Sequence, residues 1–146
     1  MSRETGCYSG EDVRAIDDLL QRLEEAVARG DPEALAALFC REVSAVFSGT
    51  SEPVRGREAV IATWKRHMAR WSEVRIARRH TVVRIHGDVA WGSFMWDGEG
   101  RVDGQHYRLE GERWTVVMLW EDGGWRLAQT HTSMPYRNWE SHRVDG

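Results

Sequence analysis

Apolar positions in the first half of the chain recur every three or four residues, which is the spacing of an amphipathic α-helix. Ser9 and Asp12 resemble the capping box that begins a helix, and Gly30 ends the stripe. Asp31 and Pro32 then have the residue types of an N-cap and a first helical position, which predicts a second helix. The expected inner positions are Val13, Ile16, Leu20, Leu23 and Val27 in the first helix, and Leu35, Leu38 and Phe39 in the second.

A short strand and a third helix are predicted between residues 43 and 71. Val43, Ala45 and Phe47 alternate with less apolar residues, which is the pattern of a strand. Ser48–Gly56 contains the Gly and Pro of a loop. Helical spacing then returns at Val60, Trp64, His67 and Trp71. His67 occupies a position of this stripe where a hydrophobic residue is expected, so we predict that it faces the interior.

Alternation replaces the helical spacing after residue 75 and predicts a series of antiparallel strands. The expected strands are Arg75–His86, Val89–Asp97, Tyr107–Glu121 and Trp125–Ser133. Tight turns are expected at Gly87-Asp88 and at Asp122-Gly123, and Asp-Gly between strands is the signal of a type I′ hairpin. Gly98–Gln105 is predicted to be a charged, Gly-rich loop.

The turn at Asp122-Gly123 sets the expected register of the last hairpin. A two-residue loop pairs Trp120 with Trp125, Met118 with Leu127, Val116 with Gln129 and Trp114 with His131, all on one face. The same argument in the preceding hairpin groups Arg79, Thr81, Val83 and Ile85 with Ala90, Gly92, Phe94 and Trp96. Asp97 is expected to point away, so the predicted inner face holds no carboxylate within its regular strands.

Helices followed by long antiparallel strands predict an α+β fold in which the helices cover one face of a curved sheet. The uncovered face still carries four large apolar residues, Trp91, Met95, Val117 and Leu119. A continuous apolar sheet face is rarely left in water, because one tryptophan alone buries about 150–250 Å² when it is covered. We therefore expect a homodimer that packs through this face.

Composition narrows the class of protein. The chain has 146 residues and a net charge of −3, which is typical of one globular domain and argues against a nucleic-acid-binding surface. No apolar run approaches the ~18 residues that suggest a membrane span, and the N-terminal segment lacks the apolar region of a signal peptide. Cys7 and Cys40 form no metal-binding pattern, and we expect free thiols in the cytoplasm. The expected domain covers residues 9–133, between a flexible N-terminus, 1–8, and a C-terminal tail, 134–146.

Four segments carry a family resemblance: ARGDPEALAALF at Ala28–Phe39, RGREAV at Arg55–Val60, HGDVAW at His86–Trp91 and DGGWRLAQTHTS at Asp122–Ser133. With them the chain resembles the SnoaL-like branch of the nuclear transport factor 2-like superfamily, which includes ketosteroid isomerase-like proteins and the association domain of calcium/calmodulin-dependent protein kinase II. The resemblance implies a cystatin-like, cone-shaped α+β barrel, with three N-terminal helices packed on a strongly curved, mostly antiparallel sheet around a pocket. It also implies that the face with Phe94, Trp96, Val116, Gln129 and His131 looks inward.

His131 is the leading candidate for acid–base chemistry, because imidazole titrates near neutral pH. Gln129 is a candidate for orienting a ligand carbonyl, and His67 for reaching the pocket. The alternative for each of the three residues is a structural hydrogen bond with a neighbour. Ligand contacts are expected from Trp64, Phe94, Trp96, Trp114, Val116, Met118 and Trp125. No third ligand accompanies the two histidines, so neither a metal nor an organic cofactor is expected.

Two classes of function fit these residues. The first is an isomerase, cyclase or dehydratase that acts on a polycyclic, polyketide-like molecule with His131 as the acid–base group. The alternative is a non-catalytic ligand-binding or oligomerisation domain, which the missing inner carboxylate favours. In both cases the expected partners are a small apolar or aromatic molecule and a second copy of the chain, without nucleic acid or membrane.

Overall fold

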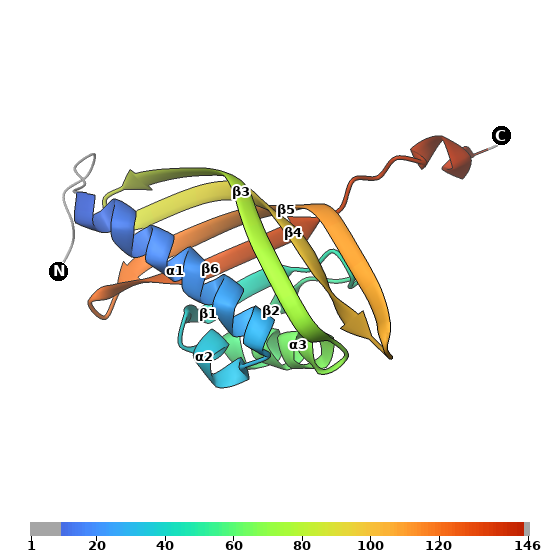
Figure 1. Ribbon diagram of the computed structural model, residues 1–146. Helices are drawn as coiled ribbons and strands as arrows, with labels where there is room; N and C mark the ends of the chain where they lie inside the picture. Colours follow the sequence, from blue (N-terminus) through green and yellow to red (C-terminus); the bar gives the residue numbers. More distant parts are fainter. Residues whose placement is uncertain (1–9, 145–146) are drawn as a thin grey trace.

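Three helices lie against one face of a curved sheet (Figure 1). The structure is a computed structural model and describes residues 10–144. The helices are α1 (Gly10–Arg29), α2 (Pro32–Ala36) and α3 (Arg57–Ala69), with a 3-10 helix, η1 (Trp139–His142), near the C-terminus. The strands are β1 (Phe39–Val46), β2 (Val54–Arg55), β3 (Ser72–His86), β4 (Val89–Val102), β5 (Gln105–Glu121) and β6 (Gly124–Ser133).

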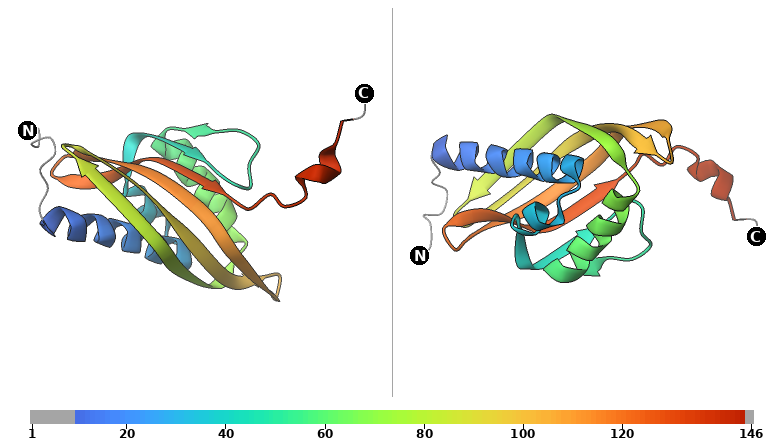
Figure 2. Two further views of the ribbon diagram at one scale, coloured as in Figure 1. Left: turned by 90° about the horizontal axis from the view of Figure 1, so that it is seen from above. Right: turned by 60° about the horizontal axis from the view of Figure 1, so that its bottom comes forward.

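The six strands form one sheet in the order β2-β1-β6-β5-β4-β3. β1 runs parallel to β6, and every other neighbouring pair is antiparallel. The sheet curves around the helices without closing into a barrel, because β2 and β3 remain its two edges (Figure 2). The predicted α+β class, with three helices on a mostly antiparallel sheet, is confirmed.

α1 packs through one stripe, in which Ile16, Leu20 and Leu23 are almost fully buried. Val13, predicted to belong to this stripe, is 50% exposed. The predicted capping residue Ser9 lies outside the described residues. At the other end, Gly30 has a φ of 65° and Asp31 caps α2 by accepting a hydrogen bond from the Ala34 N–H, as the residue types predict.

Both α2 and α3 end before the apolar spacing does. α2 ends at Ala36, and Phe39 is buried as the first residue of β1 rather than as part of a helical face. α3 ends at Ala69, so Trp71 leaves the helix and packs edge-on against Tyr107, with ring centres 6.1 Å apart. In these places contacts with distant residues, and not local periodicity, decide where the helix stops.

The predicted loop at Gly98–Gln105 is wrong, because β4 and β5 continue through it to a tight turn. Asp103 and Gly104 form that turn with φ values of 52° and 78°, as in a type I′ hairpin. Gly100 belongs to β4, and a Cβ atom there would lie 2.9 Å from the Trp71 ring. This glycine therefore marks a close approach of the sheet to Trp71, and not a flexible loop.

The last hairpin keeps its predicted register near the turn. Asp122 and Gly123 have φ values of 52° and 78°, which fits the expected type I′ turn. The pairs nearest the turn are those predicted, Trp120 with Trp125 and Met118 with Leu127.

A β-bulge at Ala128 shifts the rest of this hairpin by one residue. Beyond the bulge, Gln129 pairs with Val117 instead of Val116. His131 pairs with Thr115 instead of Trp114. These two predicted pairs are therefore wrong. A one-residue shift exchanges the two faces of a strand, so Gln129 and His131 lie exposed on the outer face. Thr130 and Thr132 are buried in their place.

A second bulge, at residues 80–81 of β3, has the same effect on the preceding hairpin. The pairs nearest the turn are those predicted, but beyond the bulge Arg78 pairs with Trp96 and Arg79 with Met95. The prediction that Arg79 shares the inner face with Trp96 is wrong, and Arg78 occupies that face. Arg78 bonds Glu24 and Asp17 of α1 and lies over the Phe94 ring, so it fastens the first helix to the sheet.

The two faces of the sheet differ in how they are covered. The inner face, against the helices, carries the buried core, in which Trp114 is the largest fully buried side chain. The outer face carries the four apolar residues predicted there, Trp91, Met95, Val117 and Leu119, and Trp91 is 46% exposed. After β6 the chain leaves the body as an extended segment that ends in η1 (Figure 1).

Candidate functional site

A cavity of about 550 Å³ lies between the end of α1, α3, the start of β3 and the inner faces of β4 and β5. Its apolar wall is formed by Val27, Trp64, Met68, Trp71, Val74, Ile76, Trp96 and Leu109. Its polar lining residues are Arg29, Ser48, His67, Arg70, Ser72, Glu73, Glu99 and Glu112. Three tryptophans in the wall and polar groups around them suit a pocket for a small molecule that carries both apolar and polar parts.

Stacked aromatic rings support this wall. Trp114 lies behind it, and its ring centre is 6.1 Å from that of Trp64, 4.3 Å from Trp96 and 5.5 Å from Phe94. Trp64 and Trp96 stand in front and face the cavity. The Nε1 atoms of these two residues are buried, and no described residue accepts a hydrogen bond from them. The wall is therefore rigid and holds two indole donors that the described protein residues leave unused.

Glu112 brings a carboxyl group to this aromatic wall. It lies two residues before Trp114 on the inner face of β5 and pairs in register with Trp96. The Trp114 Nε1–H donates to Oε1 over 2.7 Å, and the Ser48 hydroxyl donates to Oε2 over 3.2 Å. Burial raises the pKa of Glu112, and the two hydrogen bonds oppose that rise without cancelling it. The carboxyl group is thus held in place and binds a proton more tightly than an exposed glutamate.

His67 enters the cavity from α3. Its ring makes edge-on contacts with Phe47 and Trp64, with ring centres 5.4 Å and 6.5 Å apart. Burial lowers the pKa of His67, and the neighbouring Arg66 lowers it further. A neutral imidazole carries one donor and one acceptor nitrogen. The surroundings therefore bring the proton affinities of Glu112 and His67 closer together than those of the free side chains.

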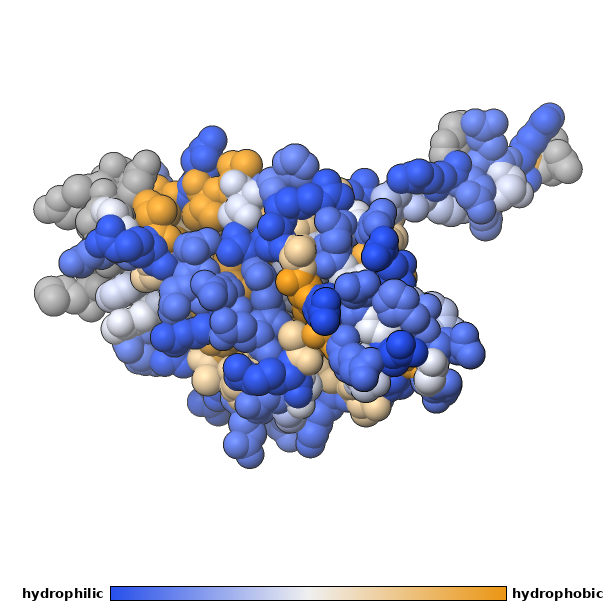
Figure 3. Space-filling model, in the orientation of Figure 1, coloured by the Kyte–Doolittle hydropathy of each residue, from blue (hydrophilic) through white to orange (hydrophobic). Residues whose placement is uncertain are grey.

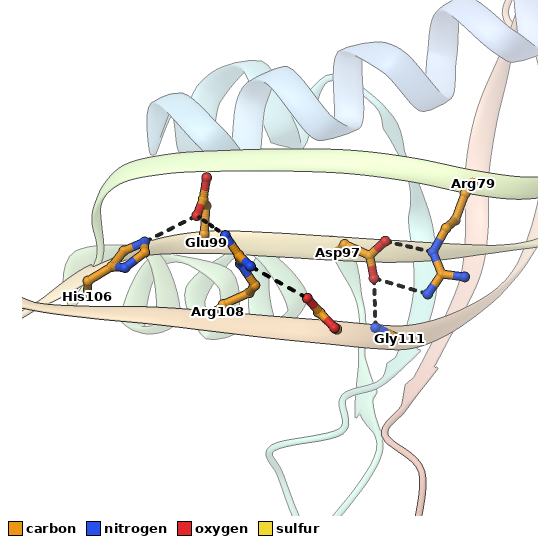
Figure 4. A network of polar contacts seen from close by, with 7 residues as sticks. Arg79, Asp97, Glu99, His106, Arg108 and Gly111 are labelled. Carbon is orange, nitrogen blue, oxygen red and sulfur yellow. Dashed lines mark hydrogen bonds and ion pairs between the residues drawn. The ribbon is translucent and has the colours of Figure 1, made fainter.

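The acids of the neighbouring β4 segment are engaged elsewhere (Figure 4). Asp97 accepts two hydrogen bonds from Arg79 and one from the Gly111 N–H, and these contacts lower the pKa of Asp97. Glu99 is bonded to His106, which lowers the pKa of Glu99. Asp97 alternates with Trp96 on β4 and lies on the outer side, as the sequence predicts, whereas Glu99 borders the cavity. Neither has the raised pKa of Glu112.

A second hollow, of about 410 Å³, lies between α1 and β3. Its wall is mostly aliphatic, and an apolar patch appears near the start of α1 in the space-filling view (Figure 3). The charged residues that line it are Asp17 and Arg84, and Asp17 is paired with Arg78. This hollow therefore offers an apolar surface whose one carboxyl group is already engaged in an ion pair.

The structure brings together only part of the predicted site. Trp64, Trp96 and His67 line the cavity. The other predicted ligand contacts are buried in the core and are absent from the cavity lining; they are Phe94, Trp114, Val116, Met118 and Trp125. Trp125 instead donates its Nε1–H to Asp12 of α1 over 3.2 Å. The prediction that Gln129 and His131 face the pocket is wrong, because the bulge at Ala128 turns them outward.

The expectation of an inner face without a carboxylate is also wrong, because of Glu112. The signal was present in the sequence: Glu112 shares the parity of Trp114, Val116 and Met118. No bulge separates these residues on β5, so alternation alone places Glu112 on the inner face. Its contact with Ser48 could not be inferred in this way, because Ser48 lies 64 residues away in the chain.

The three helices, the open curved sheet and the cavity define the class of protein: an α+β protein with a pocket between its helices and its sheet. The sequence profile of the SnoaL-like domain matches residues 16–137, and the chain belongs to this family. A search among curated proteins found no match.

Solved structures share the fold at low sequence identity. A nuclear transport factor 2-like protein of unknown function from Pseudomonas putida KT2440 has 20% identity and a TM-score of 0.80, over 96% of both chains. A "putative dehydratase" of the same family from Streptomyces avermitilis has 22% identity and a TM-score of 0.78, over 88% of this chain and 99% of the other. A "putative calcium/calmodulin dependent protein kinase II association domain" from Xanthomonas campestris has 18% identity and a TM-score of 0.76, over 94% and 99%. Other neighbours are described as cystatin-like, which confirms the predicted fold.

Two further findings concern residues 10–144. No helix among them is long and apolar enough to cross a membrane. No three His, Cys, Asp or Glu side chains in this part of the chain gather as a metal-binding group.

Proposed function

We propose that this protein is an acid–base catalyst of the isomerase, cyclase or dehydratase type, with Glu112 as the group that transfers the proton. The observation that carries the proposal is a carboxyl group of raised pKa, fixed by two hydrogen bonds, in an aromatic cavity. The ligand is a small, largely apolar molecule with aromatic or fused rings. The Streptomyces avermitilis neighbour, described as a dehydratase candidate, supports this class of chemistry.

The proposed step is proton abstraction beside a carbonyl group. Ionised Glu112 takes the proton from the carbon, the C–H bond breaks, an O–H bond forms on the carboxyl group, and the electron pair moves to the carbonyl oxygen as an enolate. His67, on the helical wall, donates its N–H to that oxygen. The proton then returns to a different carbon in an isomerisation, or the enolate expels a β-hydroxyl group, which leaves as water when Glu112 returns the proton.

The surroundings of both groups suit this step. A base whose pKa is raised toward the working pH accepts a proton more readily and remains able to return it. A neutral histidine donates a hydrogen bond through its N–H group without carrying a positive charge. The apolar wall lowers the polarity around the site, which strengthens the hydrogen bonds to a developing enolate.

Deuterium exchange into bicyclic ketones tests the proposal, with 2-tetralone as the first probe. We expect the wild-type protein to accelerate exchange of its α-protons in D₂O, followed by proton NMR. Glu112→Gln keeps the shape of the side chain and is expected to lower the rate by about 100-fold or more. His67→Gln is expected to cause a smaller loss.

His131→Ala is the matched control, because His131 lies on the outer face and should not affect exchange. Full activity of the Glu112→Gln variant would contradict the proposal. The alternative, a non-catalytic binding domain, predicts that the ketones quench tryptophan fluorescence but that exchange is no faster than in buffer.

We also propose that a second copy of the chain covers the outer face of the sheet. Trp91 is 46% exposed and lies beside Val117, while Val89, 37% exposed, lies beside Leu119. These neighbours form a continuous apolar band across β4 and β5. Gln129, next to Val117 on β6, adds hydrogen-bonding groups at the border of the band.

Sedimentation velocity tests the dimer at micromolar concentration. We expect the wild-type protein to sediment as a dimer and Trp91→Glu to sediment as a monomer, because the new charge would be buried in the contact. Val13→Glu is the control, since Val13 is equally exposed but lies on α1. A monomeric wild-type protein would show that the proposal is wrong.

A further inference from the structure

The carboxyl group of Glu112 is connected to strand β6 through Ser48 by two consecutive hydrogen bonds. The Ser48 hydroxyl donates to Oε2 of Glu112, and the Ser48 backbone N–H donates to the Thr132 hydroxyl over 2.9 Å. Ser48 follows β1 at the exposed rim of the cavity, where the chain leaves the sheet. Thr132, in contrast, is buried on β6, so it offers a firm attachment point for Ser48.

The two oxygens of Glu112 have partners of different kinds. Oε1 accepts from the indole N–H of Trp114, which can only donate, so Oε1 must remain an acceptor while that bond persists. Oε2 faces a serine hydroxyl, which can donate or accept. When the carboxyl group is ionised, Ser48 donates to Oε2. When Oε2 carries a proton, the hydroxyl of Ser48 can turn and accept it.

We infer that Ser48 and Thr132 are positioning residues: Ser48 lets Oε2 of Glu112 bind and release a proton without losing its hydrogen bond, and Thr132 holds Ser48 at that oxygen. The value of this arrangement for catalysis rests on the proposed function. The protonation itself can be measured without any substrate. Because Ser48 is exposed, its hydroxyl also connects the titrating oxygen to water.

The bulge at Ala128 is what makes this arrangement possible. In the unbroken register, residue 132 would lie on the outer face, and its hydroxyl could not reach Ser48. The shift of one residue brings Thr132 inward opposite Trp114, the residue that holds the other oxygen of Glu112. Trp114 donates to one oxygen of Glu112, and Thr132 holds the residue that donates to the other oxygen. Both hydrogen bonds to the carboxyl group therefore depend on this pair of neighbours on β5 and β6.

Titration of Glu112 by NMR tests the inference. The signal of its side-chain carboxyl carbon is assigned by its absence in Glu112→Gln, and the indole N–H of Trp114 by its absence in Trp114→Phe. We expect both signals of the wild-type protein to change with one common midpoint. Ser48→Ala removes a hydrogen bond that favours the charged carboxylate, so the midpoint should move to higher pH. Thr132→Val should move it in the same direction by a smaller amount.

Conservative variants separate positioning from general damage to the fold. Ser48→Thr and Thr132→Ser keep the hydroxyl groups and should keep the wild-type midpoint. Thr50→Ala is a matched control in the same loop, because its hydroxyl donates to the Glu52 carbonyl and should leave Glu112 unchanged. The indole signals away from the site show whether each variant is folded.

An unchanged or lower midpoint in Ser48→Ala would overturn the inference. If Ser48→Ala shifts the midpoint and folded Thr132→Val does not, the role of Thr132 is refuted. These outcomes are independent of the proposed function. If the titration behaves as expected but Glu112→Gln has no effect on ketone exchange, the positioning stands and the proposed catalysis fails.

Discussion

The two halves of the β5–β6 hairpin differ in the register of their strand pairing, although the sequence alternates in both. Next to the turn, Trp120 pairs with Trp125, as alternation and the Asp-Gly turn predict. Beyond Ala128, each residue of β5 meets the neighbour of its expected partner. Alternation is reliable along one strand, but one unpaired residue changes which face of the next strand is buried.

The shifted half is the one that borders the candidate site. There the bulge replaces an inward Gln129 and His131 with Thr130 and Thr132. The histidine that seemed best suited to catalysis on sequence grounds thus lies in solvent. A threonine with no obvious role supports the carboxyl group through Ser48. The irregular half therefore determines which polar groups lie beside the candidate site.

Deletion of Ala128 is the most direct way to abolish the difference between the halves, and we expect the largest effect from it. The shorter strand would turn Gln129 and His131 inward. Each buried polar group without a partner costs about 1–3 kcal/mol, so the total loss of unfolding free energy should be on the order of 5 kcal/mol. Urea unfolding measures this loss. A deletion variant as stable as the wild type would mean that the bulge is not required.

Trp114→Ala removes the central ring of the shifted half. We expect a loss of about 3–5 kcal/mol, because Trp114 is 1% exposed, stacks on Trp64 and Phe94 and packs against Trp96 in a tilted geometry. Trp91→Ala is the comparison, with a much smaller loss expected from a ring that is 46% exposed. Urea unfolding of both variants at equal protein concentration gives the difference. Equal losses would contradict the assignment of the two faces.

Glu112→Gln tests the environment of the carboxyl group through the pH dependence of the free energy of unfolding. Burial raises the pKa of Glu112 above its value in the unfolded chain, so between the two values the folded protein binds more protons than the unfolded chain. Ionisation of Glu112 therefore costs stability as the pH rises through the folded pKa. We expect Glu112→Gln to be more stable than the wild type at pH 8, by less than about 1 kcal/mol.

This gain should vanish at acidic pH, where Glu112 is protonated in both the folded and the unfolded chain. Urea unfolding at several pH values measures the difference. A gain that is the same at every pH would assign it to packing and not to the charge of the carboxylate.

His131→Ala should have the smallest effect. An exposed side chain away from specific contacts usually changes the free energy of unfolding by no more than about 0.5 kcal/mol. Thr130→Ala, one residue earlier, is the matched comparison and should cost more, because Thr130 is 2% exposed. If His131→Ala cost more free energy of unfolding than Thr130→Ala, the assignment of Thr130 to the inner face and of His131 to the outer face would be wrong.

Much of the fold was predictable from local patterns. The helical spacing of Ile16, Leu20 and Leu23 locates α1 and its buried face, and Asp122-Gly123 locates the last turn. The site was predictable only in part. His67, Trp64 and Trp96 follow from periodicity within single elements, and so does Glu112 once the parity of Trp114 is extended by two residues.

Periodicity and turn chemistry are local properties of the chain, so the sequence alone specified the three helices, the long strands and their order. It did not reveal β2, which lies within the predicted loop Ser48–Gly56. The bulges at Ala128 and at residues 80–81 depend on contacts of each strand with its neighbours and with the helices, so they became evident only in the folded protein. The tertiary structure also decided the environment of Glu112. Ser48 reaches this carboxyl group from a distant part of the chain, and Trp96 pairs with Glu112 on the neighbouring strand. The burial of Glu112, which raises its pKa, exists only when these parts are folded together.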